Sequence, residues 1–242
     1  DGLFNLFPAE EVYGMHNMPG MNVGEFAVAP GPMMAARDNF EILVQGRGAH
    51  AAMPHQGVDP VVVGSHIVLA LQTITSRNIN PQESLVVSVT QFHAGEAFNI
   101  IPDSVLLKGT CRVFDKELQD TLPERMRLIT DGVALTFGAK SELTYHSGYP
   151  ATINTKSQSE FCAEIAQEIA GSANGVDLNP VPYMGAEDFS YMLQERPGGD
   201  IWAGNGDSAG LHHPEYDFND QLLAVGASYW SKLVEQRLFK AS

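Results

Sequence analysis

The sequence has few cysteines and few positive charges, and it lacks any long apolar run. Its only cysteines, Cys111 and Cys162, are distant from each other. This favours free, buried thiols in a reducing, cytoplasmic compartment, and two thiols are too few for a cysteine-based metal site. Lysine and arginine number 14 against 29 aspartate and glutamate residues. The formal net charge of −15 therefore argues against nucleic acid and anionic membranes as partners. No apolar stretch approaches the roughly 20 residues that a membrane-spanning helix needs.

The first residues also lack the basic segment that begins a signal peptide. Their abrupt start predicts a chain cut from a longer polypeptide. What the chain does contain suffices for a sizeable core, because 44% of its 242 residues are hydrophobic and 18% are charged. This composition is typical of a soluble globular protein with one or two domains.

Residues 37–149 alternate regularly between strand and helix patterns. The alternation predicts strands near residues 40–45, 84–92, 105–113 and 141–145. An apolar stripe predicts a helix opened by Asp59-Pro60, and a second stripe predicts a helix over residues 122–137, with Pro123 at its start. The resulting order, β-α-β-β-α-β, is that of a ferredoxin-like sandwich with two helices on one face of an antiparallel sheet.

Residues 1–36 and 150–242 have a different texture and favour one domain interrupted by that insert. We expect short strands at residues 12–15 and 25–28, a linker or sharp turn at Pro30-Gly31-Pro32, and a buried strand at residues 201–203. The same patterning predicts a helix over residues 161–169 that Gly171 ends, and a last helix over residues 222–233 with Asn219-Asp220 as its N-cap.

Three short segments combine histidine with residues typical of loops, and such loops often carry function. They are residues 13–19 (Tyr-Gly-Met-His-Asn-Met-Pro), 46–55 (Gly-Arg-Gly-Ala-His-Ala-Ala-Met-Pro-His) and 211–220 (Leu-His-His-Pro-Glu-Tyr-Asp-Phe-Asn-Asp). Imidazole suits Zn²⁺, Mn²⁺ and Ni²⁺. A lone loop histidine is more often a surface or hydrogen-bonded residue, so the patterns alone leave both readings open.

In their order and spacing the three segments resemble the C-terminal two-thirds of the M20 family of metal-dependent amidohydrolases, near hippurate hydrolase and the N-acyl-amino-acid hydrolases. The resemblance runs along essentially the whole chain. It implies an α/β metallopeptidase catalytic domain, present as residues 1–36 and 150–242, with an inserted ferredoxin-like dimerisation or lid domain over residues 37–149. The N-terminal catalytic portion of the family is absent from the chain.

The resemblance also implies roles for three histidines. His16 and His212 match family residues that bind a catalytic metal ion. His212 is preferred over His213 because adjacent residues on an extended loop point apart. His50 matches a family residue that reaches into the active site of the partner subunit and stabilises an oxyanion, which implies a homodimer.

For the substrate, the resemblance implies that Asn99 and Arg112 hold a carboxylate group, for which guanidinium forks are suited. A second arginine that some relatives use is absent, and Tyr149 is its nearest match. Residues 185–188 resemble a segment that lines the cleft, and the role of Glu187 stays open between structure and substrate contact.

Two family elements are missing from the sequence. These are the segment Cys-Gly-His-Asp-x-His and a Glu-Glu pair that supplies the general base and another metal ligand. Glu10-Glu11 lies too close to His16 for that role and is expected in a solvent-facing turn. Zn²⁺ normally takes three or four protein ligands, so the chain carries only part of a site that is expected to hold two ions. We expect Zn²⁺ or Mn²⁺, with Ni²⁺ and Co²⁺ as alternatives.

The predicted activity of the full-length parent is metal-dependent hydrolysis of the amide bond of small N-acyl amino acids, and the chain alone is expected to be inactive. The alternative is a non-catalytic ferredoxin-like dimerisation or ligand-sensing module. That alternative accounts for the insert but leaves His16 and His212, which lie outside it, without a purpose.

Overall fold

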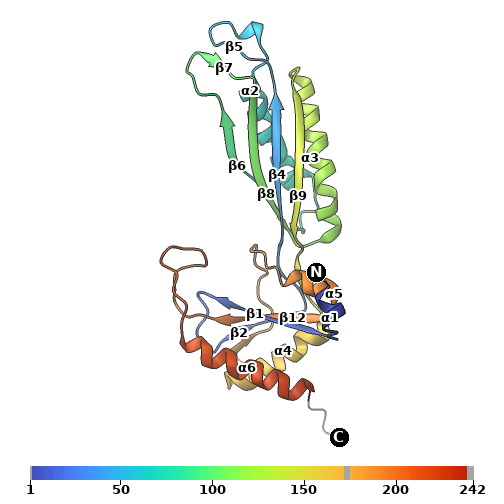
Figure 1. The fold of residues 1–242 in the computed structure, drawn as a ribbon, viewed down its shortest axis with the longest axis vertical. Coiled ribbons are helices and arrows are strands. Elements are labelled where there is room, and N and C mark those ends of the chain that lie inside the picture. The colour runs from blue at the N-terminus through green and yellow to red at the C-terminus, as the bar shows by residue number, and fades with distance from the viewer. Residues whose placement is uncertain (1, 172–174, 239–242) are drawn as a thin grey trace. The chain divides into compact units, whose positions relative to one another are not determined.

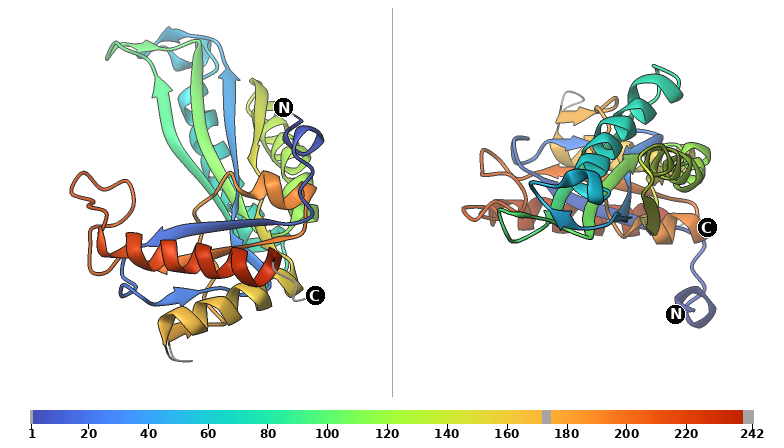
Figure 2. Two further views of the ribbon diagram at one scale, coloured as in Figure 1. Left: turned by 60° about the horizontal axis from the view of Figure 1, so that its bottom comes forward. Right: turned by 90° about the horizontal axis from the view of Figure 1, so that it is seen from above.

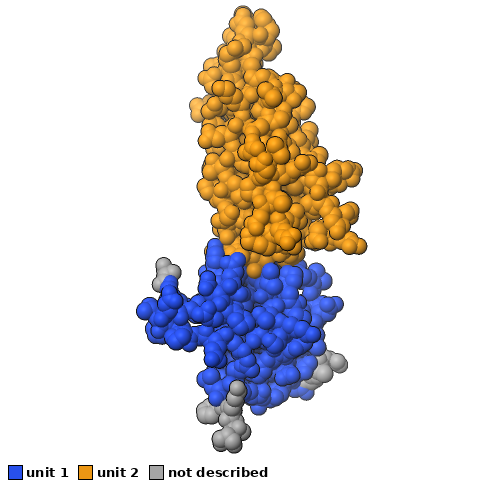
Figure 3. Space-filling model, turned by 90° about the vertical axis from the view of Figure 1, so that its right-hand side faces the viewer, with its two compact units in different colours: residues 1–34, 152–183, 187–242 blue, residues 35–151, 184–186 orange. Residues whose placement is uncertain are grey.

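The chain forms two compact units in the computed structural model, which describes residues 2–171 and 175–238. Unit 1 combines residues 1–34, 152–183 and 187–242, and unit 2 comprises residues 35–151 and 184–186 (Figure 3). Chain segments from before and after residues 35–151 therefore belong to the same unit. No helix in the described part of the chain is both long and apolar enough to cross a bilayer.

Unit 2 is built on an antiparallel sheet with the strand order β6-β8-β4-β9. Along the chain its large elements follow the order β-α-β-β-α-β (Figure 1). These elements are β4 (Ala36–Gln45), α2 (Pro60–Thr73), β6 (Leu85–Ala94), β8 (Ser104–Val113), α3 (Lys116–Thr136) and β9 (Lys140–Tyr149). The unit also contains β5 (Ala49–His50), a 3₁₀ turn (Pro54–Gln56), a π-helical turn (Ile74–Asn78) and β7 (Ile100–Ile101).

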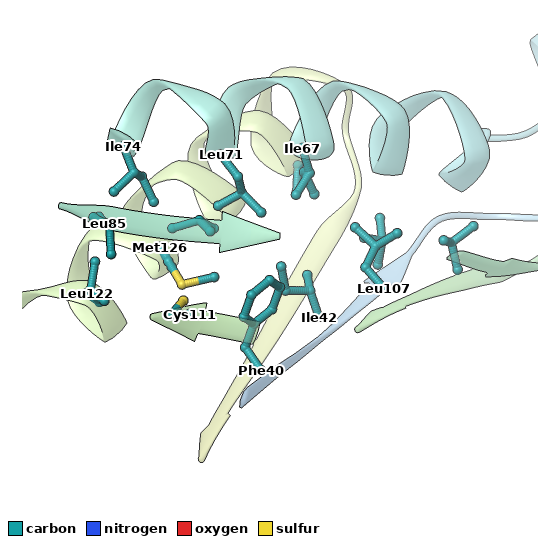
Figure 4. Close-up of a cluster of buried hydrophobic side chains, with 14 of the residues drawn as sticks. Phe40, Ile42, Ile67, Leu71, Ile74, Leu85, Leu107, Cys111, Leu122 and Met126 are labelled. Carbon is teal, nitrogen blue, oxygen red and sulfur yellow. The ribbon is translucent and has the colours of Figure 1, made fainter. Parts of the chain in front are cut away.

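Alternating burial along the strands determines which face of this sheet the helices cover. In β4 every second residue from Ala36 to Val44 is buried, and β8 shows the same alternation. Helices α2 and α3 pack on that buried face (Figure 2), where Phe40, Ile67 and Leu122 join one hydrophobic core (Figure 4). Burying each such side chain contributes about 1.5–3 kcal/mol. The opposite face of the sheet is left open by both helices.

Side-chain caps set the starts of the helices in unit 2. Asp59 accepts a hydrogen bond from the Val61 amide at 2.9 Å and Pro60 lies in the first turn of α2, as predicted. The predicted start of α3 at Pro123 is wrong, because α3 begins at Lys116. Asp115 caps that earlier start by accepting from the Leu118 amide at 2.7 Å. Pro123 therefore lies inside the helix, where it removes one backbone hydrogen bond.

A buried carboxylate joins three elements of unit 2. Asp38 in β4 is only 1% exposed. It accepts hydrogen bonds from Gln119 Nε2 in α3 at 3.0 Å, from the Tyr145 hydroxyl in β9 at 2.8 Å and from the Gly148 amide at 2.8 Å. Three donors thus satisfy the charge away from water, and they fix α3 and β9 relative to β4.

Unit 1 contains a four-stranded mixed sheet with the order β1-β12-β2-β11. Helices α4 and α6 cover one face of it (Figure 2), where Phe26, Ile201 and Tyr229 lie in a second hydrophobic core. The unit comprises α1 (Leu3–Leu6), β1 (Val12–Met18), β2 (Phe26–Ala27), β3 (Gly31–Met34), β10 (Thr152–Asn154), α4 (Lys156–Ala170), β11 (Val176–Asp177), α5 (Ser190–Glu195), β12 (Gly198–Gly204) and α6 (Gln221–Leu238).

Several local predictions for unit 1 are confirmed. Gly171 ends α4 in the left-handed conformation with φ of 68°. The Asn219 side chain accepts from the Gln221 amide at 3.0 Å at the start of α6. Cys162 is buried and free, as is Cys111 in unit 2, and burial raises the pKa of these thiols to about 11 and about 12 respectively.

Two other local predictions are wrong. Of the two alternatives at Pro30-Gly31-Pro32, the linker is wrong and the sharp turn is confirmed, because Gly31 has φ of 88° and begins β3, which pairs antiparallel with β10. Glu11 does not face solvent, because it accepts hydrogen bonds from the Tyr13 hydroxyl at 2.7 Å, Gln158 Nε2 at 2.8 Å and Arg237 Nε at 2.6 Å. The bond from Arg237 is the main cause that lowers the pKa of Glu11 to about 2.

The Asp38 cluster leads to a stability prediction. Asp38→Ala leaves three buried donors without an acceptor, so we expect the free energy of unfolding of unit 2 to fall by about 3 kcal/mol or more. Asp115→Ala removes only an exposed helix cap and is expected to cost about 1 kcal/mol. Urea unfolding followed by far-ultraviolet circular dichroism compares the two variants. An Asp38→Ala loss no larger than that of Asp115→Ala contradicts the stabilising role.

Candidate functional site

His16 lies on the face of the unit 1 sheet that α4 and α6 leave uncovered. Strand β1 runs parallel to β12, with His16 opposite Trp202 and Gly14 opposite Asp200. Its neighbours Tyr13 and Met15 pack into the core on the other face, and the alternation of the strand directs His16 away from that core. Gly14 is required here, because a Cβ atom would lie 2.8 Å from Asp200 Oδ1.

The ring of His16 is held in an orientation that leaves one nitrogen available. Nδ1 lies 2.7 Å from the Asn17 carbonyl oxygen, which can only accept, so Nδ1 carries the proton and donates. Nε2, the other ring nitrogen, faces Glu187 Oε2 at 3.5 Å. The other oxygen of Glu187 accepts from the Phe189 amide at 3.3 Å. A backbone carbonyl that fixes the tautomer of a histidine is typical of metal ligands.

The C-terminal histidine segment is tethered beside His16. The Asn17 side-chain amide donates a hydrogen bond to the Tyr216 hydroxyl, so the first and last histidine segments are in direct contact. Asn205 supports the same loop by donating to the Asp217 carbonyl at 3.0 Å and accepting from the Asn219 amide at 2.9 Å. Sequence reasoning missed this contact, although both residues belong to the quoted segments.

The two adjacent histidines of this loop differ in their surroundings. His213 Nδ1 accepts from the Glu215 amide at 3.1 Å, so its ring is engaged within the loop. His212 is exposed and has φ of 65°, which makes it the one non-glycine residue with positive φ in the described part of the chain. Such backbone strain at a polar loop residue is a reason to consider a functional role.

A divalent metal fits the chemistry of His16 and Glu187 but needs further ligands. An imidazole nitrogen and a carboxylate oxygen that face each other are both ordinary ligands of Zn²⁺. Within residues 2–171 and 175–238, no group of three or more His, Cys, Asp or Glu side chains is arranged to hold a metal ion. His16 and His212 therefore lie in neighbouring segments without forming a complete ligand set.

A buried aspartate that sequence reasoning missed lies on the same face of the sheet. Asp200 in β12 is 1% exposed, and its Oδ2 atom has no hydrogen-bond partner. Burial, and secondarily the charge of Glu187, raises the pKa of Asp200 to about 7. An acidic residue directly before the predicted buried strand at residues 201–203 was the available signal.

In unit 2 the structure brings His50 and Asn99 together. His50 in β5 pairs with Ile100 in β7, and the Ala51 amide donates to the Asn99 carbonyl at 3.0 Å. Both residues line one open depression at this end of the unit. Gly48 permits the close approach of the two segments, because a Cβ atom there would lie 2.8 Å from the Ile101 carbonyl oxygen.

Arg112 does not join His50 and Asn99 within one chain. Asn99 precedes the start of β8 at Ser104, whereas Arg112 lies near the opposite end of that strand. Eight residues of extended strand span about 27 Å, which is too far for two side chains to hold one carboxylate. His66 was predicted to have a structural role, and its ring lies against that of Phe137 with ring centroids 4.7 Å apart.

Residues 1–236 match the sequence profile of peptidase family M20/M25/M40. The chain belongs to the M20 family of amidohydrolases. This confirms the family that the three histidine segments predicted. The α/β architecture of mixed sheets and helices also matches that of M20 peptidase structures.

Three M20 relatives give the extent of the similarity. N-acetyl-L-cysteine deacetylase of Bacillus subtilis (strain 168) is 35% identical over 96% of this chain and 55% of its own length. Hippurate hydrolase of Campylobacter jejuni is 38% identical over 96% of this chain and 61% of its own length. The Bacillus subtilis YXEP protein, a dinuclear metal binding peptidase from the M20 family, has a TM-score of 0.76 at 30% identity over 95% of this chain and 57% of that one. The chain thus spans little more than half the length of these relatives.

Asp200 leads to a pH prediction for this M20 chain. The unfolded chain releases the Asp200 proton near the ordinary pKa of 3.8, whereas the folded chain retains it up to about 7. Stability is therefore fully present below pH 3.8 and is lost as the pH rises towards 7, by up to about 3 kcal/mol between pH 5 and pH 7.

We expect Asp200→Asn to remove this dependence. The measurement is urea unfolding of the metal-free chain at several pH values, followed by the fluorescence of Trp202 and Trp230, which both lie in unit 1. Asp207→Asn, at an exposed aspartate of the same unit, serves as the control and should follow the unmodified chain. If the free energy of unfolding changes equally with pH in both variants, ionisation of Asp200 does not destabilise the folded chain.

Proposed function

We propose that the full-length protein hydrolyses the amide bond of small N-acyl amino acids with the help of divalent metal ions, Zn²⁺ or Mn²⁺. The observation that carries this proposal is the contact between the first and last histidine segments through Asn17 and Tyr216, beside a His16 ring whose Nε2 faces the Glu187 carboxylate. The activities of two relatives, a deacetylase of N-acetyl-L-cysteine and a hydrolase of hippurate, support the substrate class.

In this proposal His16 and His212 are metal ligands. When bound, the metal polarises the amide carbonyl and lowers the pKa of water. Asn17 fixes the His16 tautomer through its carbonyl oxygen, and its side chain holds the C-terminal loop beside the ring through Tyr216. Glu187 faces the same nitrogen of His16, so we assign it to the immediate surroundings of the metal. The proposal assigns the remaining ligands and the general base to parts of the full-length protein other than the described residues.

His50 and Asn99 act together on the substrate in this proposal, with His50 as the donor to the oxyanion. Their shared support on β5 and β7 argues that they move as one group. Because Arg112 lies about 27 Å along β8 from Ser104, the end of the strand that follows Asn99, all three can act on one substrate only if two subunits contribute. This supports a homodimer in which unit 2 is the ferredoxin-like dimerisation domain, with an edge strand of its sheet, β6 or β9, as the element that would pair.

The first test concerns the metal ligands in the full-length protein. His16→Ala and His212→Ala should each lower bound metal and turnover by more than the 10–100-fold that indirect partners of a metal site cost. His213→Ala should lower them much less, because that ring already accepts from the Glu215 amide. Elemental analysis and hydrolysis of hippurate are the two measurements. Unchanged metal in the His212 variant rules it out as a ligand, and no hydrolysis by the unmodified protein favours the non-catalytic module.

The second test concerns the subunit that supplies His50. In the full-length protein His50→Ala should keep its metal and its fold and lose about 10²–10³-fold in turnover. Mixing His50→Ala subunits with His16→Ala subunits should restore part of the activity, because one hybrid site then contains both intact residues. Each variant alone is the control, and exchange is verified by co-purification of differently tagged subunits. No recovery despite proven exchange means that His50 acts within its own subunit or not at all.

A further inference from the structure

The open face of the unit 2 sheet carries two positive charges that have no carboxylate partner among the described residues. Four charged side chains of β4 and β8 point to this face: Arg37, Glu41, Lys108 and Arg112. Lys108 pairs with Glu41 at 3.0 Å. No ion pair of the described residues involves Arg37 or Arg112.

The two arginines are direct neighbours across the sheet. Arg37 in β4 is the register partner of Arg112 in β8, so their side chains emerge from adjacent backbone positions on the same face. Like charges directly opposite each other in an antiparallel pair are destabilising. The chain retains this arrangement although both side chains are half-buried.

The surroundings of the two arginines are partly apolar, and they leave the Nε donor of Arg37 without a hydrogen-bond acceptor. Val86 in β6 lies beside Arg112, and Tyr149 in β9 lies beside Arg37, so a row of four side chains crosses the sheet. The Arg37 guanidinium lies 4.8 Å from the centre of the Tyr149 ring. Arg37 Nε is buried and has no hydrogen-bond partner, which is costly for a charged donor.

Arg112 is only partly engaged. Its Nη1 donates to the Thr110 hydroxyl and, at 2.9 Å, to the Cys111 carbonyl oxygen, both on its own strand. Burial, and secondarily the charge of Arg37, lowers the pKa of Arg112 from its ordinary value. A cation destabilised in this way gains from any anion that reaches it, and the guanidinium fork is suited to bind a carboxylate through two parallel hydrogen bonds.

We propose that Arg37 and Arg112 together form a binding site for a small dicarboxylate. One carboxylate balances only one of the two charges, whereas a dianion balances both. The connection to catalysis rests on the proposed function. There Arg112 takes one carboxylate of the substrate, and Arg37 adds a preference for N-acyl derivatives of acidic amino acids such as glutamate, which carry a second carboxylate.

Binding is measured on the 242-residue chain by isothermal titration calorimetry at low ionic strength, without metal and without turnover. The probes are glutarate and glutaramate, which match in size and differ by one negative charge. Glutarate should bind at least tenfold more tightly than glutaramate, and Arg37→Gln should abolish that difference, whereas Arg37→Lys should keep part of it. The control is Arg125→Gln on α3, whose side chain bonds Asn78 and lies outside the row.

The free chain provides a check on folding. Because Arg37→Gln removes a like-charge contact, its unfolding temperature should equal or exceed that of the unmodified chain, and glutarate should raise only the latter. Equal affinities for glutarate and glutaramate, or an Arg37→Gln variant that still separates them, would overturn the site. Inorganic phosphate that binds more tightly than glutarate overturns the assignment to dicarboxylates.

In the full-length protein the same substitution should lower the ratio of kcat/KM for N-acetylglutamate over N-acetylglutamine about tenfold, with KM carrying most of the change. A protein that binds glutarate as expected but hydrolyses no N-acyl amino acid contradicts the proposed function and leaves the anion site standing. A protein that hydrolyses both amides with a ratio unaffected by Arg37→Gln contradicts the specificity role and leaves the proposed function standing.

Discussion

The parallel pairing of β1 with β12 is the interaction on which the candidate site depends. It joins a strand near the start of the chain to one near its end, with Val12 opposite Gly198 and Met18 opposite Gly204. A parallel pair needs a long connection, and here that connection includes all of unit 2. Because the pair is in register, His16 emerges beside Trp202, and the loop that follows β12 can reach Asn17 through Tyr216.

Elements with a strong local pattern were predictable from the sequence. The apolar stripe and the Asp59-Pro60 start located α2, Gly171 located the end of α4, and alternation located β8. Pro123 misled the prediction of where α3 begins, because the rule that proline is disfavoured inside a helix is local. The Asp115 cap and the packing of α3 into the core outweigh the one hydrogen bond that proline removes.

The first and last histidine segments that the sequence singled out are in contact, but the sequence did not predict how buried polar groups elsewhere in the chain are satisfied. Glu11, with its bond to Arg237, and Asp38, with its bond to Gln119, depend on contacts between elements that are distant along the chain. Asp200 is the opposite case, because the fold buries its Oδ2 atom without a hydrogen-bond partner. Residue type alone cannot tell a carboxylate with hydrogen-bond donors from one without them. The difference depends on which strands from distant parts of the chain pair, and in which register.

The sheet of unit 2 separates residues to which the family resemblance assigns one common substrate. His50 and Asn99 belong to one end, where β5 and β7 hold them as a pair, and Arg112 belongs to the other end of β8 beside Arg37. A rigid antiparallel sheet cannot fold back to join its ends, so no motion within unit 2 brings these groups to one ligand. A substrate that needs both ends must therefore contact two copies of the chain. If His50 donates to the oxyanion and the two arginines bind carboxylates, as proposed, different subunits would supply these groups and activity would require a dimer.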